Sequence, residues 1–395
     1  MKSFLLFLYC LSAQAAFELP GFELVYTTPA ETSLQNPDLR GPAEVWVDMI
    51  SSAKKTIDFE QMYAVSKPGE ALEVVIEAME AAANRGVKIR FLLEEKMLRA
   101  SSAETITRLE KIKNLELRIL NFGKLGTGGI IHAKFFVVDG KTAYVGSQNF
   151  DWRSLRHIHE TGLRTTDAKI SAQLQEIFHH DWRAWEMVEK GMKVPALRSK
   201  PLVSDGKERA YLVASPNALD PRGVVDSESE LVRLLGEAKS EIRVQLLDYY
   251  PLQYDHSYYG VIDNALRAAA SRGVKIKLMV SHWNQSKPGI DYLKSLAVIP
   301  NVAVEIVTIP MAREGKIPFA RVNHSKFMVI DQRIAWVGTS NWTGGYLDKL
   351  RNVEIVVRDE KLAQRLVLLH DQLWESPYGA TLDILKDYPA PNKGE

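Results

Sequence analysis

The chain has 395 residues, of which 46% are hydrophobic and 25% are charged, and its formal net charge is +1. This composition excludes an intrinsically disordered chain, and the length is enough for two domains or two closely joined halves. The balanced charge excludes a protein that grips long duplex nucleic acid through many phosphates. A short groove for one strand or one headgroup remains compatible with it.

The first sixteen residues predict a signal peptide. Lys2 supplies a positive start, residues 4–11 are apolar, and Ala-Gln-Ala at 13–15 is typical of a cleavage site. The run is too short for a membrane span, which needs ~20 residues. We therefore expect export to the cell exterior, the periplasm or an organelle lumen. Cys10, the single cysteine, would leave with the peptide, so the mature chain would lack disulfides and thiolate ligands.

The chain that follows repeats itself. The sequence AAANRGVKIR at 81–90 returns as AAASRGVKIK at 268–277. In each copy an Ala-rich helix ends at a glycine, and a strand that alternates basic and apolar residues comes next. A helix and a strand are also predicted ahead of each copy, over 44–55 and 56–63 and over 228–239 and 241–249. This alternation predicts an α/β fold in which sheets are layered with helices.

A second repeat carries polar residues. The sequence HAKFFVVD at 132–139 returns as HSKFMVID at 324–331, an offset of 192 residues. The offset holds through Gly146 and Gly338 and through Asn149 and Asn341. Two coincident copies of this length indicate a duplicated unit rather than a chance match.

The two repeats predict how the chain is divided. A first half over 17–191 and a second half over 212–395 are joined by a linker over 192–211, which contains two prolines and mixed charges. We expect the halves to pack as an intramolecular pseudo-dimer, with one His-Lys strand from each half at a shared cleft.

The polar residues of each copy are predicted to lie close together. Side chains two apart on a strand share a face, so His132 and Lys134 project together. A turn follows Asp139, and the returning strand would bring Asn149 toward His132. The second copy repeats this arrangement with His324, Lys326 and Asn341.

These six side chains form a coherent set for phosphodiester cleavage. One neutral imidazole attacks phosphorus and forms a phosphohistidine, while the other, protonated, protonates the leaving oxygen and later activates water. Lysine and asparagine side chains hold the nonbridging oxygens, so neither a metal nor a cofactor is required. The remaining histidines show no ligand spacing for a metal.

Both copies resemble the HKD signature of the phospholipase D superfamily, H-x-K-x4-D-x6-G-[ST]-x-N, without a departure. Three neighbouring segments, at 150–154, 319–323 and 340–346, are similar to one branch of that superfamily. This branch contains animal lysosomal 5′-exonucleases and poxvirus envelope proteins. The resemblance implies the phospholipase D fold: two similar α-β-α sandwich halves with one active site at their interface.

The resemblance also implies supporting roles. Asp139 and Asp331 would stabilise the turn after each motif strand. A glutamate about thirty residues beyond each histidine would hold one ring nitrogen of an imidazole and raise the basicity of the other. The supporting set comprises Asp139, Asp331, Glu160, Glu354, Ser147 and Thr339. By resemblance to most members, His132 is expected to attack and His324 to act as acid and then as base.

Three residues near the motifs are candidate substrate contacts. Trp342 and Tyr346 follow the second hairpin, where an aromatic ring can stack on a base or face acyl chains. Arg321 lies in the loop before the second motif, where it could bind a flanking phosphate or remain a solvated charge.

Three functions fit these observations. The branch resemblance favours a phosphodiesterase that acts on single-stranded nucleic acid from an end. A phospholipase D or transphosphatidylase acting on phospholipid, with contact to a membrane surface, would use the same mechanism. A non-catalytic envelope or binding protein could keep the same fold. The sequence does not decide the oligomeric state.

Overall fold

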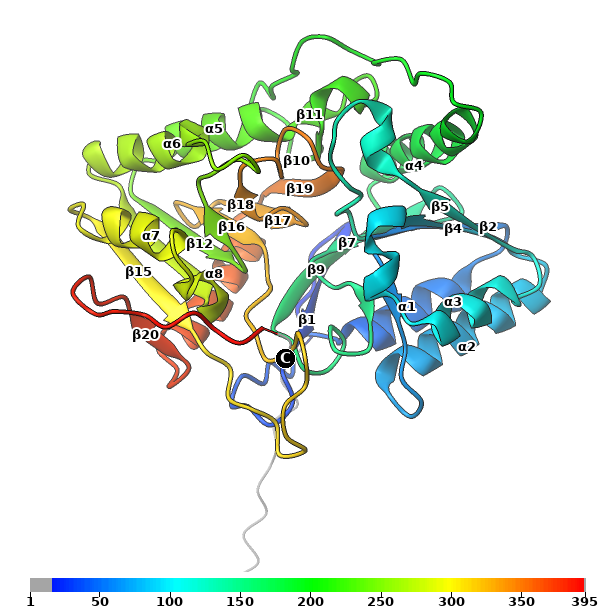
Figure 1. The fold of residues 1–395 in the computed structure, drawn as a ribbon, viewed down its shortest axis with the longest axis horizontal. Helices are drawn as coiled ribbons and strands as arrows, with labels where there is room; N and C mark the ends of the chain where they lie inside the picture. Colours follow the sequence, from blue (N-terminus) through cyan, green and yellow to red (C-terminus); the bar gives the residue numbers. More distant parts are fainter. Residues whose placement is uncertain (1–15, 394–395) are drawn as a thin grey trace, which may run out of the picture.

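The computed structural model describes residues 16–393, so the predicted signal peptide lies outside the described residues except for Ala16. Two β-sheets flanked by helices lie side by side (Figure 1). None of the helices within residues 16–393 has both the length and the apolar character that a membrane crossing needs.

The first sheet has seven strands in the order β1-β9-β7-β6-β2-β4-β5. Strands β2, β4 and β5 are parallel, and the β6–β7 hairpin and β9 run antiparallel to their neighbours. The strands are β1 (Phe22–Thr27), β2 (Thr56–Gln61), β4 (Lys88–Glu94), β5 (Leu115–Leu120), β6 (Phe135–Val138), β7 (Thr142–Gly146) and β9 (Glu160–Thr165). The helices of this half are α1 (Pro42–Ser52), α2 (Ala71–Asn84), α3 (Ala103–Glu110) and α4 (Ala168–Glu189).

The second sheet repeats this order as β10-β19-β17-β16-β12-β14-β15 and adds the edge strands β11 and β20. Its strands are β10 (Ala210–Ser215), β11 (Val225–Asp226), β12 (Glu241–Leu246), β14 (Lys275–Ser281), β15 (Val302–Val307), β16 (Phe327–Ile330), β17 (Ile334–Gly338), β19 (Asn352–Arg358) and β20 (Gly379–Thr381). Its helices are α5 (Ser227–Glu237), α6 (Gly260–Ser271), α7 (Gly289–Ala297) and α8 (Glu360–Trp374). The predicted α/β pseudo-dimer is therefore confirmed.

Short elements complete the fold. Two small parallel pairs lie beside the motif hairpins: β3 (Ala64–Val65) with β8 (Phe150–Asp151), and β13 (Tyr249–Tyr250) with β18 (Trp342–Thr343). The 3-10 helices are η1 (Glu95–Ala100), η2 (Phe122–Leu125), η3 (Asn217–Leu219) and η4 (His282–Gln285). Residues 190–209, between α4 and β10, contain neither helix nor strand. Strand β10 starts at Ala210, inside the segment predicted as a linker.

The predicted helix–glycine–strand units appear in both halves. Helices α2 and α6 are followed by Gly86 and Gly273, whose φ angles of 93° and 88° lie in the left-handed region. Glycine adopts this conformation without a Cβ penalty, so it ends the helix and turns the chain into the next strand.

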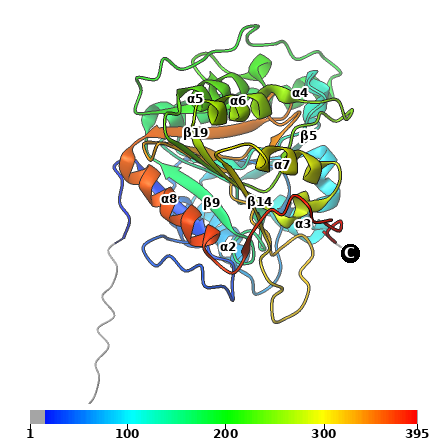
Figure 2. The same cartoon turned by 90° about the vertical axis from the view of Figure 1, so that its left-hand side faces the viewer.

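Each sheet packs helices on both faces, and the halves share one core. In the second half, α5, α6 and α7 cover one face and α8 the other (Figure 2). A central apolar cluster joins α4 and α8 to the facing strands of both sheets, including Phe135, Val145, Phe327 and Val337. Full burial of such side chains contributes ~1.5–3 kcal/mol each, which holds the halves, and therefore the two motifs, in fixed relative positions.

Candidate active site

The two motifs are joined across the halves by backbone hydrogen bonds. The His132 N–H donates to the Arg351 carbonyl over 2.9 Å, and the His324 N–H donates to the His159 carbonyl over 2.9 Å. Each motif histidine is therefore held beside the start of the partner strand of the other half, β19 or β9. One active site at the interface follows, as predicted.

Gly129 makes one of these contacts possible. The Arg351 N–H donates to the Ile130 carbonyl over 3.0 Å, so the two backbones run side by side just before His132. A Cβ at position 129 would overlap the Lys349 backbone, including its carbonyl oxygen. A glycine is required where two backbones approach this closely.

His324 is paired with a carboxylate from the other half. Its Nδ1 lies 2.7 Å from Oε2 of Glu160, the first residue of β9. Burial lowers the pKa of His324 to about 4, and the negative charge of Glu160 opposes that change by favouring the imidazolium. Burial opposes ionisation of Glu160, but the charges of His324 and Lys326 outweigh it and lower the pKa of this carboxyl.

His132 is paired with a neutral amide. Its Nδ1 lies 2.9 Å from Oδ1 of Asn352. The amide orientation is fixed because the Thr339 hydroxyl donates to the same Oδ1 over 2.8 Å, while Nδ2 donates to the Tyr346 carbonyl over 2.8 Å. Burial and the nearby charges of Lys134 and Lys326 lower the pKa of His132 well below 6.5, which favours the neutral ring.

The prediction of Glu354 as an imidazole partner is wrong. Glu354 accepts hydrogen bonds from the hydroxyls of Ser227, over 2.6 Å, and Ser340. Burial raises its pKa to about 7. Glu354 lies two residues further along β19 than Asn352, a displacement of ~7 Å, so it meets α5 instead of the imidazole.

The two motif lysines lie between the histidine strands. The Lys326 ammonium donates to the His324 carbonyl over 2.6 Å, and the Lys134 ammonium donates to the His132 carbonyl. Burial lowers the pKa of Lys326 to about 7, and burial together with the charge of Lys326 lowers that of Lys134 well below 10.5. A bound phosphodiester anion would favour the charged form of both lysines.

The other supporting side chains bond away from the imidazoles or hold their partners. Ser147 bonds to the backbone of Thr161, beside Glu160, with its hydroxyl 3.1 Å from both the N–H and the carbonyl oxygen. Asp139 accepts three backbone N–H groups from residues 54–56 at 2.7–2.9 Å, and Asp331 accepts three from residues 239–241 at 2.8–2.9 Å. The two aspartates anchor each motif turn to the loop after α1 or α5.

The motif asparagines are buried in the same region. Asn149 Oδ1 has no hydrogen-bond partner among the residues that the structure describes. Asn341 Oδ1 accepts the Asp248 N–H over 3.4 Å. The approach of each asparagine to the histidine of its own half stays a prediction.

Of the three predicted substrate contacts, only Tyr346 lies beside the histidines. Its ring meets His132 edge-on, with 4.8 Å between centroids. Trp342 is 1% exposed and packs against Trp336 in the core of the second half. Arg321 is buried and donates to the carbonyls of Pro310 and Ala30 over 2.6 and 2.7 Å. The predictions for Trp342 and Arg321 are therefore wrong.

Sequence reasoning missed Asn352 and Arg351. Applying the 192-residue offset to Glu160 leads to position 352, so this signal was present in the sequence. Arg351 is fully buried and bonds to Asp181 of α4 and to Asp220 at 2.6–3.0 Å. It links the two halves directly beside the partner of His132.

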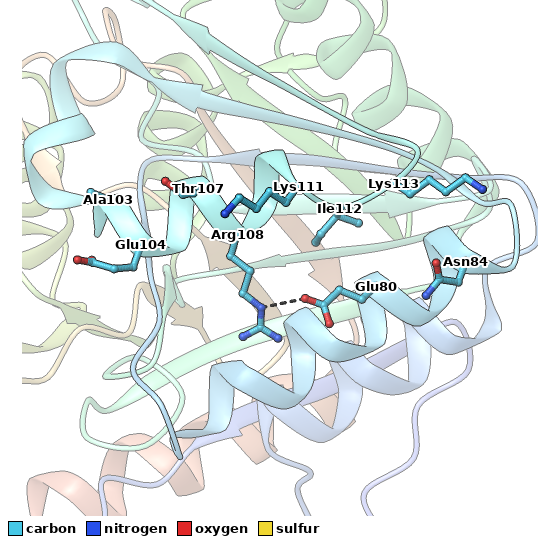
Figure 3. Close-up of a pocket in the computed structure, with 9 residues that line it drawn as sticks. All are labelled: Glu80, Asn84, Ala103, Glu104, Thr107, Arg108, Lys111, Ile112 and Lys113. Carbon is cyan, nitrogen blue, oxygen red and sulfur yellow. Dashed lines mark hydrogen bonds and ion pairs between the residues drawn. The ribbon is translucent and has the colours of Figure 1, made fainter.

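Two hollows differ in their relation to the motifs. One of about 740 Å³ lies between α2 and α3, where Arg108 pairs with Glu80, and no motif residue lines it (Figure 3). Another of about 280 Å³ is lined by Tyr346, which contacts His132. Within residues 16–393, no group of three or more His, Cys, Asp or Glu side chains is placed to hold a metal ion.

Comparison with known proteins gives the family. The family described as "Cardiolipin synthase, PLD-like domain" matches residues 46–182 and 231–374, one segment in each half. The chain belongs to the phospholipase D superfamily. As a member, it is a phosphodiesterase, a hydrolase that acts on phosphodiester substrates.

The relatives differ in the activity that their names give. Phospholipase D Z of Dictyostelium discoideum is 32% identical, over 85% of this chain and 85% of the relative. The 5′-3′ exonuclease PLD4 of Mus musculus is 30% identical, over 88% of this chain and 76% of the relative. The solved phosphatidylserine synthase of Haemophilus influenzae has a TM-score of 0.59 and 11% identity, over 86% of this chain and 85% of that one, and shows the shared fold.

Proposed function

We propose that this phosphodiesterase hydrolyses single-stranded nucleic acid from an end, through a covalent phosphohistidine. The observation that carries the mechanism is the pair of buried histidines from opposite halves, each with Nδ1 engaged by a residue of the other half. Because Nδ1 is engaged, Nε2 of each ring is the atom that can react. Two buried lysines accompany the pair.

The different partners of the two histidines support different roles for them. Glu160 favours the proton on His324, whereas His132 faces a neutral amide. The charges of Lys134 and Lys326 disfavour a proton on both rings, so the carboxylate is what distinguishes them. The neutral His132 Nε2 attacks phosphorus, and the bond to the leaving oxygen breaks as His324 gives that oxygen its proton. His324 then takes a proton from water, whose oxygen attacks phosphorus and breaks the P–N bond.

The remaining motif side chains stabilise charge. Lys134 and Lys326, both buried, would bind the nonbridging oxygens as these gain negative charge, and buried donors act strongly because water is excluded. Asn149 and Asn341 supply amide donors from each half. In this mechanism the side chains do the work that a metal ion would do, so no metal is required.

The choice of nucleic acid as substrate rests on sequence similarity and on exposed aromatic rings beside lysine side chains. The chain is similar to 5′-3′ exonucleases over 87–92% of its length. Tyr254 lies beside Gly345, and Phe319 meets Trp283 edge-on; the two side chains are 57% and 53% exposed. Lysine ammonium groups lie over Tyr254 and over the Trp283 ring. Exposed aromatic rings beside cations suit the bases and phosphates of a single strand.

A phospholipid substrate is the second candidate, because the chain is also similar to phospholipase D Z, at 32% identity over 85% of its length. A substrate panel in excess EDTA separates the two. It contains labelled single-stranded oligonucleotides with free and blocked ends, the matching duplex, and vesicles of phosphatidylcholine or phosphatidylglycerol. We expect stepwise shortening of the single strand from one unblocked end, absent in His132→Ala. Phospholipid turnover without nucleotide release would overturn the proposed substrate.

A further inference from the structure

A small hollow beside the catalytic pair is not used by the mechanism above. It measures about 280 Å³ and is lined by residues that include Asp248, Tyr250, Trp283, Asn284, Tyr346 and Lys393, here called the tail pocket. Ligand pockets usually measure ~300–1,000 Å³, so this one is large enough for a single small group but not for a continuing strand or an acyl chain.

The tail pocket shares two walls with the active site. Tyr346 meets His132 edge-on at 4.8 Å between ring centroids. The Asp248 N–H donates to the side chain of Asn341 over 3.4 Å, and the charge of Lys326 acts on the Asp248 carboxyl. A group bound in this pocket therefore lies next to the phosphorus that His132 attacks.

The C-terminal segment supplies part of the pocket. After β20 the chain runs across the second half toward the first half, as far as Lys393, the last residue that the structure describes (Figure 1). The Lys393 carbonyl accepts the Phe319 N–H over 3.1 Å, and Lys316 donates to the Asn392 side chain over 3.0 Å. The Lys393 ammonium lies 5.5 Å from the centre of the Trp283 ring. These bonds hold a cation at the pocket mouth.

The lining favours one ligand chemistry. Three aromatic rings suit a planar base, and a base stacked on an aromatic side chain is a common mode of single-strand binding. If an acyl chain filled the pocket, the Lys393 ammonium would lose hydration without gaining a partner, and the Asp248 carboxyl, which accepts the Asn284 amide over 3.4 Å, would gain no further one. A nucleoside with its phosphate offers a partner to each: a hydroxyl for Asp248 and a negative charge for Lys393.

We propose that the tail pocket binds the terminal nucleoside of the single strand, with Trp283 stacking on the base and Lys393 binding the adjacent phosphate. This inference rests on the proposed nuclease function and names the subsite that accounts for cleavage from an end. A pocket for one nucleoside accepts a chain terminus and rejects an internal residue.

The stacking role is tested by coupling protein and substrate changes. kcat/KM is measured for wild type, Trp283→Leu and Trp283→Phe, each with an oligonucleotide whose 5′ nucleotide is normal or abasic. We expect the abasic end to cost wild type roughly 5- to 100-fold, the range of one base stack. On the normal substrate, kcat/KM of Trp283→Leu should be lower than that of wild type by the same factor. On the abasic substrate, Trp283→Leu and wild type should differ little. Trp283→Phe should give intermediate values. An equal abasic penalty in wild type and Trp283→Leu would overturn the proposal.

The phosphate role is tested with a matched pair in the same C-terminal segment. Lys393→Met should raise KM several-fold, leave kcat within about twofold, and reduce the slope of log(kcat/KM) against log[salt] by roughly one. Lys386→Met removes the same charge at a position that contacts Tyr388 and does not line the pocket, so it should leave these values unchanged. Identical behaviour of the two variants would remove Lys393 from the subsite.

The same experiments separate failure of the subsite from failure of the proposed function. If the protein cleaves oligonucleotides but the abasic end lowers kcat/KM equally in wild type and Trp283→Leu, the subsite alone would be overturned. Hydrolysis of phosphatidylglycerol but of no oligonucleotide would overturn both. Loss of phospholipid turnover in Trp283→Leu and Lys393→Met would instead assign the pocket to a lipid headgroup.

Discussion

The two halves place different chemistry at equivalent backbone positions. Glu160 and Asn352 stand 192 residues apart, each begins a strand, and each reaches Nδ1 of the histidine of the other half. One partner is a carboxylate and the other a neutral amide. The comparison shows how a duplicated scaffold can place two identical histidines beside different charges: Glu160 favours the imidazolium of His324, whereas Asn352 brings no charge to His132.

The two halves also differ at the residue that precedes each histidine partner. His159 has Nδ1 3.0 Å from the Ser325 hydroxyl and from the Gln245 amide, and burial lowers its pKa to about 4, which keeps it neutral. The equivalent Arg351 is bound by the carboxylates of Asp181 and Asp220. The backbone contacts are alike on both sides, but Arg351 belongs to a buried ionic network whereas the equivalent His159 is neutral.

The largest expected effect is loss of either histidine. His132→Ala and His324→Ala should each reduce kcat by roughly 10³-fold or more, because nucleophile and acid act as one unit. Circular dichroism and the melting temperature should stay close to wild type. Substantial activity in either variant would mean that the halves do not share one site.

Changing the charge of each histidine's partner should shift the pH dependence of kcat/KM in opposite directions. Glu160→Gln removes the charge that favours the His324 imidazolium, so the alkaline limb of kcat/KM should move to lower pH and kcat should fall ~10–100-fold. Asn352→Asp adds a charge beside His132, so its pKa should rise and the acid limb, where the nucleophile becomes neutral, should move to higher pH.

Glu354→Gln is the matched control for these profiles, because its carboxyl bonds to Ser227 and Ser340 and not to an imidazole. Both limbs should stay in place in this variant. A shift as large as that of Glu160→Gln would contradict the pairing seen in the structure.

The wild-type profile follows from the same pKa changes. Burial lowers the pKa of His324 to about 4, and the ring must carry a proton to act as acid. Activity, measured as kcat/KM, should therefore fall as pH rises through a value below 6.5. A profile that rises from pH 5 to pH 8 would contradict the role of His324 as the acid.

The ionic network should matter more for stability than its neutral counterpart. Arg351→Met removes the guanidinium that two buried carboxylates share, which leaves Asp220 with Arg198 and Asp181 with His180, and should cost ~3–5 kcal/mol in the free energy of unfolding. His159→Gln should cost ~1 kcal/mol, the value of one or two neutral hydrogen bonds. Urea unfolding of both variants measures the difference, and equal losses would show that the ion pairs add nothing.

The smallest expected effect is that of a chelator. Lysines and asparagines from both halves perform the charge stabilisation, so turnover in excess EDTA should equal turnover without it. Strict dependence on added Mg²⁺ or Zn²⁺ would exclude the two-histidine mechanism.

Much of this arrangement could be predicted from the sequence, because strand periodicity and a fixed offset are local signals. These two signals predicted the two halves, their shared interface and the pair of histidines at it. Trp342 and Arg321 could not be judged this way, because position near a motif does not reveal whether a side chain turns into the core. The partner of His132 was missed because a carboxylate was sought where the duplicated position holds an amide. The tail pocket depends on Lys393, which is 69 residues from His324 in sequence and reaches the cleft only in the folded chain.

The central claim, that His132 attacks and His324 transfers protons, is tested most directly by trapping the covalent intermediate. A phosphodiester with a p-nitrophenyl leaving group needs no proton from His324, so His324→Ala should form the phosphohistidine yet lack the base for its hydrolysis. Peptide mapping of the acid-labile adduct should place the phosphate on His132 in this variant, and His132→Ala should trap nothing. Phosphate on His324 in the His132→Ala variant would contradict the assignment and reverse the roles of the two halves.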